Sequence, residues 1–92
     1  MTAGDAWSVD VTAGAERALQ RLPEKIATAV VEFITGPLAD DPKRLSKPLR
    51  GDLAGWHTSR RGHYRVTLQI DDDAHRLIIG RIEHRATVYK PR

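Results

Sequence analysis

Residues 64–71 alternate strictly between apolar and polar side chains. In chain order they are Tyr64, Arg65, Val66, Thr67, Leu68, Gln69, Ile70 and Asp71. A period of two is typical of a β-strand that buries one face in a core and leaves the other face open. The pattern therefore predicts a sheet that is covered on one side only, with the polar side chains of this strand on the uncovered side.

Three other segments are predicted to be strands. Residues 7–11 alternate between apolar and polar side chains. Residues 56–60 precede a turn at Arg61-Gly62, because glycine adopts positive φ readily. Residues 77–82 are mainly apolar, as in a central strand. The run from Asp71 to Asp73 predicts a polar hairpin tip between the last two strands.

Two short amphipathic helices are predicted between the first and second of these strands. Thr12 is a candidate N-cap, and the first apolar stripe that follows consists of Ala15, Ala18, Leu19 and Leu22. Pro23 is expected to start the second helix and Gly36-Pro37 to end it. The second stripe consists of Ile26, Val30, Phe33 and Ile34. Such helices form a hairpin that needs a sheet to cover.

A long loop is predicted over residues 38–55, because prolines, glycines and Asp40-Asp41 interrupt any regular pattern. The loop is basic, and loops of this length are usually functional or mobile. Leu45, Leu49 and Leu53 are expected to hold it against the core.

The sequence thus predicts an α+β fold with the order β-α-α-β-β-β. The helical hairpin packs on one face of a small, twisted, mostly antiparallel sheet. The 92 residues form a single domain, residues 1–92, with residues 1–6 expected to be flexible.

Composition excludes several classes of protein. The chain has no cysteine, which removes disulfides and thiol nucleophiles. His57, His63 and His75 lack metal-ligand spacing, and the Asp71–Asp73 run lacks the glycine and distant glutamate of a calcium loop. We therefore expect no metal and no cofactor. No apolar run approaches the roughly 20 residues of a membrane span, and no signal peptide is visible, so we expect a cytoplasmic protein without a membrane partner.

Charge is distributed unevenly along the chain. Residues 1–42 carry three basic and seven acidic side chains, whereas residues 43–92 carry 12 basic and five acidic ones. Nine of those 12 are arginine, which binds phosphate in a bidentate manner. A polyanion such as nucleic acid is the partner that this predicts, and a solvated basic surface is the alternative.

Several residues of the basic part are candidates for chemistry. Arg60, Arg61 and Arg65 flank the predicted hairpin turn, and Arg85 ends the neighbouring strand. Guanidinium groups brought together there repel one another unless an anion such as phosphate lies between them. Among the remaining candidates, His84 is a candidate for proton exchange, Tyr89 is able to stack on a base, and Glu83 is expected to pair with an arginine. The alternative is an ordinary strand end with surface arginines.

Three sequence blocks resemble the RelE family of toxins from bacterial toxin–antitoxin modules. They are Lys47-Pro-Leu-Arg-Gly-Asp-Leu-Ala-Gly-Trp56, Ser59-Arg-Arg-Gly-His-Tyr-Arg-Val66 and Ile82-Glu-His-Arg-Ala-Thr-Val-Tyr89. The resemblance extends from Val9 to Tyr89. It implies an mRNA interferase, a metal-independent endoribonuclease that cuts mRNA in the ribosomal A site and inhibits translation. The 2′-hydroxyl attacks its own 3′-phosphate and leaves a 2′,3′-cyclic phosphate and a 5′-hydroxyl.

The resemblance also implies roles for individual residues. Arg65 corresponds to the arginine that binds the scissile phosphate, Arg85 approximately to a transition-state arginine, Tyr89 to the tyrosine at the substrate, and His84 to a proton-transfer histidine. Basic side chains predicted to bind RNA are Lys47, Arg50, His57, Arg60, Arg61 and Arg81. The family's two lysines before the hairpin are replaced, roughly at His57 and Ser59, so the general base is not assigned.

Partners follow from the same resemblance. It implies a cognate acidic antitoxin, RelB-like, that covers the basic site, with mRNA and the ribosome as targets. Operator DNA would be bound only through the antitoxin complex. The chief alternative is a ParE-like toxin that inhibits DNA gyrase without nuclease activity, and a further one is an RNA-binding protein without catalysis.

Overall fold

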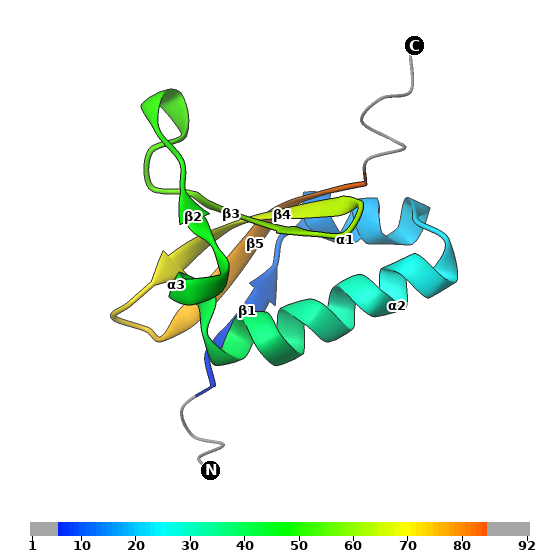
Figure 1. Ribbon diagram of the computed structural model, residues 1–92, viewed down its shortest axis with the longest axis horizontal. Helices are drawn as coiled ribbons and strands as arrows, with labels where there is room; N and C mark the ends of the chain where they lie inside the picture. The colour runs from blue at the N-terminus through cyan, green and yellow to red at the C-terminus, as the bar shows by residue number, and fades with distance from the viewer. Residues whose placement is uncertain (1–5, 85–92) are drawn as a thin grey trace.

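The computed structural model describes residues 6–84. Two of the predicted catalytic residues, Arg85 and Tyr89, and residues 1–5 at the start of the chain lie outside this range. The described chain forms one five-stranded sheet with strand order β1-β5-β4-β3-β2, and the two longest helices lie on one side of it (Figure 1). The predicted α+β fold with a helical hairpin on one sheet face is confirmed.

The sheet is antiparallel except at one edge. β3 (His57–Arg61), β4 (Tyr64–Asp71) and β5 (Arg76–His84) form an antiparallel meander. β1 (Ser8–Val11) lies parallel to the first half of β5, with Ser8 opposite Arg76. The short β2 (Lys47–Pro48) pairs with β3 at the opposite edge. The β3–β4 turn contains Gly62 at φ 58°, the positive φ that the sequence predicted there.

Local signals explain the positions of the two main helices. Thr12 caps α1 (Ala13–Arg21) by accepting a hydrogen bond from the Ala15 amide at 3.2 Å, as predicted. α2 (Glu24–Phe33) follows directly after Pro23, which is its N-cap. Gly36-Pro37 does not end the helical path. The chain continues through a π-helical turn, η2 (Ile34–Leu38), because the wider turn accommodates a proline that has no amide hydrogen.

The core lies between the helices and one face of the sheet. Val66 and Leu68 of β4 and Leu77 and Ile79 of β5 are fully buried there. They form one cluster with residues of the helical layer, namely Ala15, Val30, Phe33, Ile34 and Leu38. The alternation of residues 64–71 therefore separates the core face from the open face, as the sequence predicted.

The segment predicted to be a long loop contains regular structure. It includes the short helix α3 (Pro42–Leu45), strand β2 and the 3₁₀ turn η3 (Gly51–Leu53). Leu45 packs against the core, as expected, but the prediction for Leu53 is wrong because this side chain is 52% exposed. The η3 segment projects away from the helical layer (Figure 1, green). Among residues 6–84 no helix is long and apolar enough to span a membrane.

Candidate functional site

The open face of the sheet carries the polar side chains of its three longest strands. Arg65 on β4 lies opposite Arg60 on β3 and Glu83 on β5 in the strand register. One step along, Thr67 lies between Thr58 and Arg81. Because directly paired residues share a face, these side chains project on the side away from the helices.

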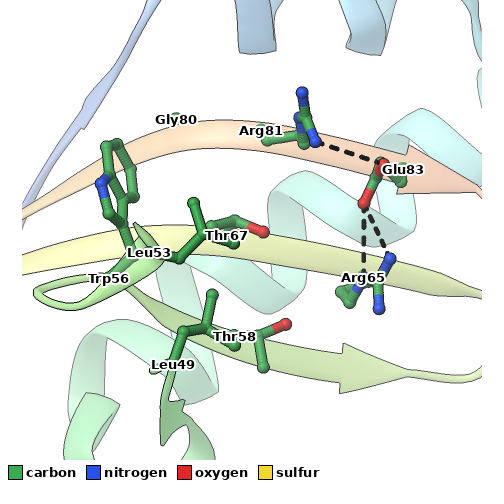
Figure 2. Close-up of a pocket in the computed structure, with 9 residues that line it drawn as sticks. All are labelled: Leu49, Leu53, Trp56, Thr58, Arg65, Thr67, Gly80, Arg81 and Glu83. Carbon is green, nitrogen blue, oxygen red and sulfur yellow. Dashed lines mark hydrogen bonds and ion pairs between the residues drawn. The ribbon is translucent and has the colours of Figure 1, made fainter. Parts of the chain in front are cut away.

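A pocket of about 410 Å³ lies on this face (Figure 2). Its apolar wall comes from the segment before β3, and its charged end comes from β4 and β5. The lining residues are Leu49, Leu53, Trp56, Thr58, Arg65, Thr67, Gly80, Arg81 and Glu83. The pocket therefore combines an aromatic surface with guanidinium groups.

Glu83 holds the charged end of the pocket together. Arg65 donates to its Oε1 from Nε at 3.3 Å and from Nη2 at 3.1 Å, while Arg81 Nη1 lies 3.7 Å from Oε2 (Figure 2). The prediction that Glu83 pairs with an arginine is confirmed. Two cations share one carboxylate, so the cluster keeps an excess of positive charge that favours an anionic ligand.

A second pocket, of about 470 Å³, adjoins the first at Arg65 and Thr58, which line both. Lys47 and Arg60 add further positive charge, as does Arg44, which is paired with Asp41 at 2.8 Å. No carboxylate of residues 6–84 lines this pocket. Arg65 therefore stands between an apolar pocket and a basic one, where a polyanion contacts several cations at once.

Trp56 of the apolar wall rests on Gly80 of β5. A Cβ built at Gly80 would lie 2.5 Å from Cζ3 and 2.7 Å from Cη2 of the indole. Gly80 lies at an irregularity in the β4–β5 register, where Thr67 pairs with Arg81 but Leu68 pairs with Ile79. The extra residue of this bulge is thus a glycine that admits the tryptophan ring.

We expect Gly80→Ala to displace Trp56 and to lower the free energy of unfolding by about 1–3 kcal/mol through overpacking. In a Trp7→Phe background, Trp56 is the only tryptophan, and its emission should shift to longer wavelength as water reaches it. Gly14→Ala is the matched control, because its Cβ would meet nothing nearer than Arg17 Nη2 at 4.0 Å. An unchanged emission spectrum in Gly80→Ala would contradict the packing described.

Some predicted RNA-binding residues lie on the other side of the sheet. Arg61 is on the helix-covered face, with its guanidinium 5.1 Å from the Phe33 ring centroid. His57 pairs with the buried Leu68 and shares that face. Arg61 and His57 are therefore not beside Arg65, because each is one strand position out of phase with Thr58 and Arg60.

His84 also lies on the helix-covered face. It is paired with Tyr64 in the strand register, and its ring centroid is 6.4 Å from that of His63. It lines a pocket between α1 and the second half of β5, together with Glu83 and Arg81. Burial raises the pKa of the nearby Tyr64 hydroxyl, and the Arg61 guanidinium partly offsets this effect. His84 therefore reaches the Arg65 cluster only around the edge of β5.

The structure explains why a lysine is absent at Ser59. This side chain is 2% exposed and donates a hydrogen bond from Oγ to the Leu45 carbonyl at 2.7 Å. Ser59 thus ties β3 to α3 on the covered face, where a lysine would lose its hydration. The positions of β3 that share the face of Arg65 are Thr58 and Arg60, whereas His57 and Ser59 lie on the covered face.

Sequence reasoning identified the arginines of the site but missed its walls. Lys47 and Arg60 line the basic pocket and Arg81 the apolar one, while Arg50 is exposed next to Leu49 and lines neither. The apolar wall and the two threonines were not predicted. A signal for the wall existed in Gly80, since a lone glycine inside a strand pattern indicates a bulge or a close approach.

Comparisons with known proteins agree with this architecture. The profile of the family described as "ParE toxin of type II toxin-antitoxin system, parDE" matches residues 9–89. The chain is 56% identical over 84 residues to Toxin RelE of Mycobacterium tuberculosis, which covers 91% of this chain and 87% of that protein. Toxin RelG of the same organism is 45% identical over 84 residues, or 91% of this chain and 97% of the relative.

A solved structure shows the same fold. The match is to a chain in the crystal structure of the toxin–antitoxin complex RelBE2 from M. tuberculosis, with a TM-score of 0.86 and 46% identity, covering 88% of this chain and 93% of that one. Fold, site and sequence together define a toxin of a type II toxin–antitoxin module. The chain belongs to the RelE/ParE family of these toxins, with RelE-like relatives, which confirms the resemblance noted in the sequence.

Proposed function

We propose that the protein is an mRNA interferase that cuts mRNA in the ribosomal A site. The observation that carries this proposal is the position of Arg65, which stands between the apolar and the basic pocket on the open sheet face. The relatives named RelE and RelG support the same activity. In the reaction, the 2′-oxygen bonds to the adjacent phosphorus and loses its proton, while the bond to the 5′-oxygen breaks and that oxygen gains a proton.

The geometry supports a phosphate-binding role for Arg65. Glu83 engages Nε and Nη2, and within residues 6–84 Nη1 has no partner and is free to donate to a phosphate oxygen. A guanidinium held in place stabilises the additional negative charge of the pentacoordinate phosphorane without reorganisation. Arg81 reaches the same carboxylate and adds a second cation.

The other candidate residues have supporting roles in the proposal. Lys47 and Arg60, with Arg44, bind the backbone phosphates along the strand, and Arg50 contacts RNA beyond the two pockets. His57 and Arg61 lie on the helix-covered face and are left out of this RNA-binding surface. Arg85 is the next residue in the sequence after β5 and Tyr89 comes four residues later, and both remain candidates, for charge stabilisation and base stacking respectively. His84 remains the candidate for proton transfer, acting around the edge of β5. We assign no metal to the reaction.

An antitoxin is the expected protein partner. The similar M. tuberculosis chain was crystallised as a toxin–antitoxin complex. We propose a cognate antitoxin of the RelB kind whose acidic residues cover the basic pocket, because complementary charge favours such association. In this proposal operator DNA is bound only through the complex, and the ribosome supplies the mRNA.

The proposed function is tested by mapping mRNA 5′ ends after brief induction in bacteria, with and without a block of translation. We expect new ends inside coding regions that disappear when translation is blocked. With the ribosome-bound substrate in vitro, replacing the attacking 2′-hydroxyl by hydrogen should abolish cleavage. Growth arrest without new ends would contradict the proposal.

The second candidate is a gyrase inhibitor, favoured by the ParE description of the matching family. This alternative predicts growth arrest with a DNA-damage response and intact mRNA. The same induction experiment therefore distinguishes the two functions. Gyrase inhibition also does not require the arginine cluster on the open face.

A further inference from the structure

The apolar pocket contains more than phosphate binding requires. A phosphate needs only the guanidinium end, where Arg65 and Arg81 meet Glu83. The apolar wall of the pocket is formed by Leu49, Leu53 and Trp56, and Leu53 is 52% exposed although it is a large apolar residue. An apolar surface left open beside a charged site is typical of a ligand-binding surface.

The tryptophan in this wall is held in place by its surroundings. The Cζ3–Cη2 edge of its ring lies against Gly80, and the residue lines the pocket. The Trp56 amide donates to the Leu53 carbonyl at 3.0 Å, and its carbonyl accepts from the Leu49 amide at 2.8 Å. An aromatic ring fixed in this way stacks on a flat ligand with little loss of conformational entropy.

A polar group near this wall lacks a partner. Thr58 Oγ1 is buried and makes no hydrogen bond within the described residues, and Thr58 lines both pockets. A buried hydroxyl without a partner is costly unless a ligand or water satisfies it. Thr67, opposite Thr58 in the register, contributes a second hydroxyl to the same pocket.

We infer that this pocket binds one nucleobase of single-stranded RNA, stacked against Trp56, with the adjoining phosphate at Arg65. This inference rests on the proposed function and adds a base-binding subsite to it. A base offers a flat apolar face to the indole and Leu53, and hydrogen-bonding edges to the threonine hydroxyls. Its phosphate lies where the guanidinium groups are.

The direct test uses the fluorescence of Trp56 in a Trp7→Phe background, where it is the only tryptophan. The probe is a short single-stranded oligonucleotide with 2′-deoxyribose at every position, which this chemistry cannot cleave. Its partner probe has the same length and phosphates but is abasic throughout. We expect the first probe to quench Trp56 emission on binding and the abasic probe to leave it unchanged.

Variants separate the base-binding wall from the phosphate site. Trp56→Leu and Leu53→Glu should each weaken binding of the base-containing probe by about tenfold, which is the loss expected from one stacked base. Neither should weaken binding of the abasic probe by as much as Arg65→Ala does. Val31→Glu is the matched control, because Val31 is 43% exposed on α2 at the helical layer, and it should change neither affinity. Circular dichroism identifies any variant that fails to fold. Leu53→Glu alters an exposed residue, so we expect this variant to fold.

The results distinguish failure of this inference from failure of the proposed function. If RNA is cut but the Trp56→Leu and Leu53→Glu variants bind and cut it as wild type does, the base-binding subsite is refuted and the interferase stands. If RNA affinity is unchanged but Leu53→Glu weakens binding of the antitoxin encoded by the neighbouring gene, the pocket belongs to a protein partner. If the probes do not bind to the wild-type protein, the base-binding subsite is refuted, and the interferase is judged separately by cleavage of mRNA on the ribosome.

Discussion

The Arg65→Ala variant should cut mRNA at least about 100-fold more slowly than wild type, and cells should grow when it is induced. Its guanidinium joins the two pockets, and removal of one preorganised charge contact to a transition state typically costs 10²–10³ in rate. The side chain is 41% exposed and lies on the open face, so the fold should persist. Cleavage is measured on programmed ribosomes, and thermal unfolding is measured in parallel.

The control for Arg65→Ala removes the same charge elsewhere. Arg17 is exposed on α1, in the helical layer away from the site, and Arg17→Ala should cut and arrest growth as wild type does. Arg65→Lys is informative too, since lysine keeps the charge but lacks the planar fork that engages Glu83 through two nitrogens. An Arg65→Ala variant that retains wild-type toxicity while stably folded would remove Arg65 from the reaction.

Leu68→Ala should produce the largest loss of stability. Leu68 is fully buried in the core, three positions from Arg65 but on the opposite face of the same strand. Leucine-to-alanine changes in a core cost about 2–5 kcal/mol, which is a large part of the 5–15 kcal/mol that usually stabilises a domain. The melting temperature should fall by more than about 8 °C. Urea denaturation gives the free energy directly.

Shortening an exposed side chain is the control for this loss of stability. Val31→Ala, at a side chain that is 43% exposed, should change the free energy of unfolding by less than about 0.5 kcal/mol. Per folded molecule, Leu68→Ala should cleave RNA at the wild-type rate, because it leaves the open face unaltered. A loss of cleavage per folded molecule that equals the Arg65→Ala effect would show that the two faces of β4 do not act independently.

The main features of the fold were predictable from sequence because each had a local cause. The alternation of residues 64–71 defined β4 and its faces, and the Thr12 cap and apolar stripes defined the helices. The segment after Pro37 was not predictable, since α3 and β2 have only four and two residues. Elements so short are stabilised by tertiary contacts, such as the Ser59 hydrogen bond to the Leu45 carbonyl, and not by local propensity.

The candidate site was predictable only in part. Arg65 and the pairing of Glu83 followed from the alternation and from charge. The sequence did not predict which side chains of β3 lie on the open face, because its residues show no clear alternation. A shift of one position moves every side chain of a strand to the opposite face. Arg60 and Arg61 are equivalent in sequence, yet one lies opposite Arg65 and the other lies over Phe33. The contact between Trp56 and Gly80 joins distant segments and required the three-dimensional structure.

The parallel pairing of β1 with β5 also determines when the molecule is able to fold. Ser8 pairs with Arg76, and Thr12 donates to the Gly80 carbonyl at 3.3 Å, across 68 residues in both cases. Within the described sheet, β1 thus has no partner until β5 has been made, and such distant pairings form late and slowly. A nascent chain released before β5 would leave β1 unpaired and the charged end of the pocket without Arg81 and Glu83. We therefore expect the toxin to acquire its working shape only after β5 has been synthesised.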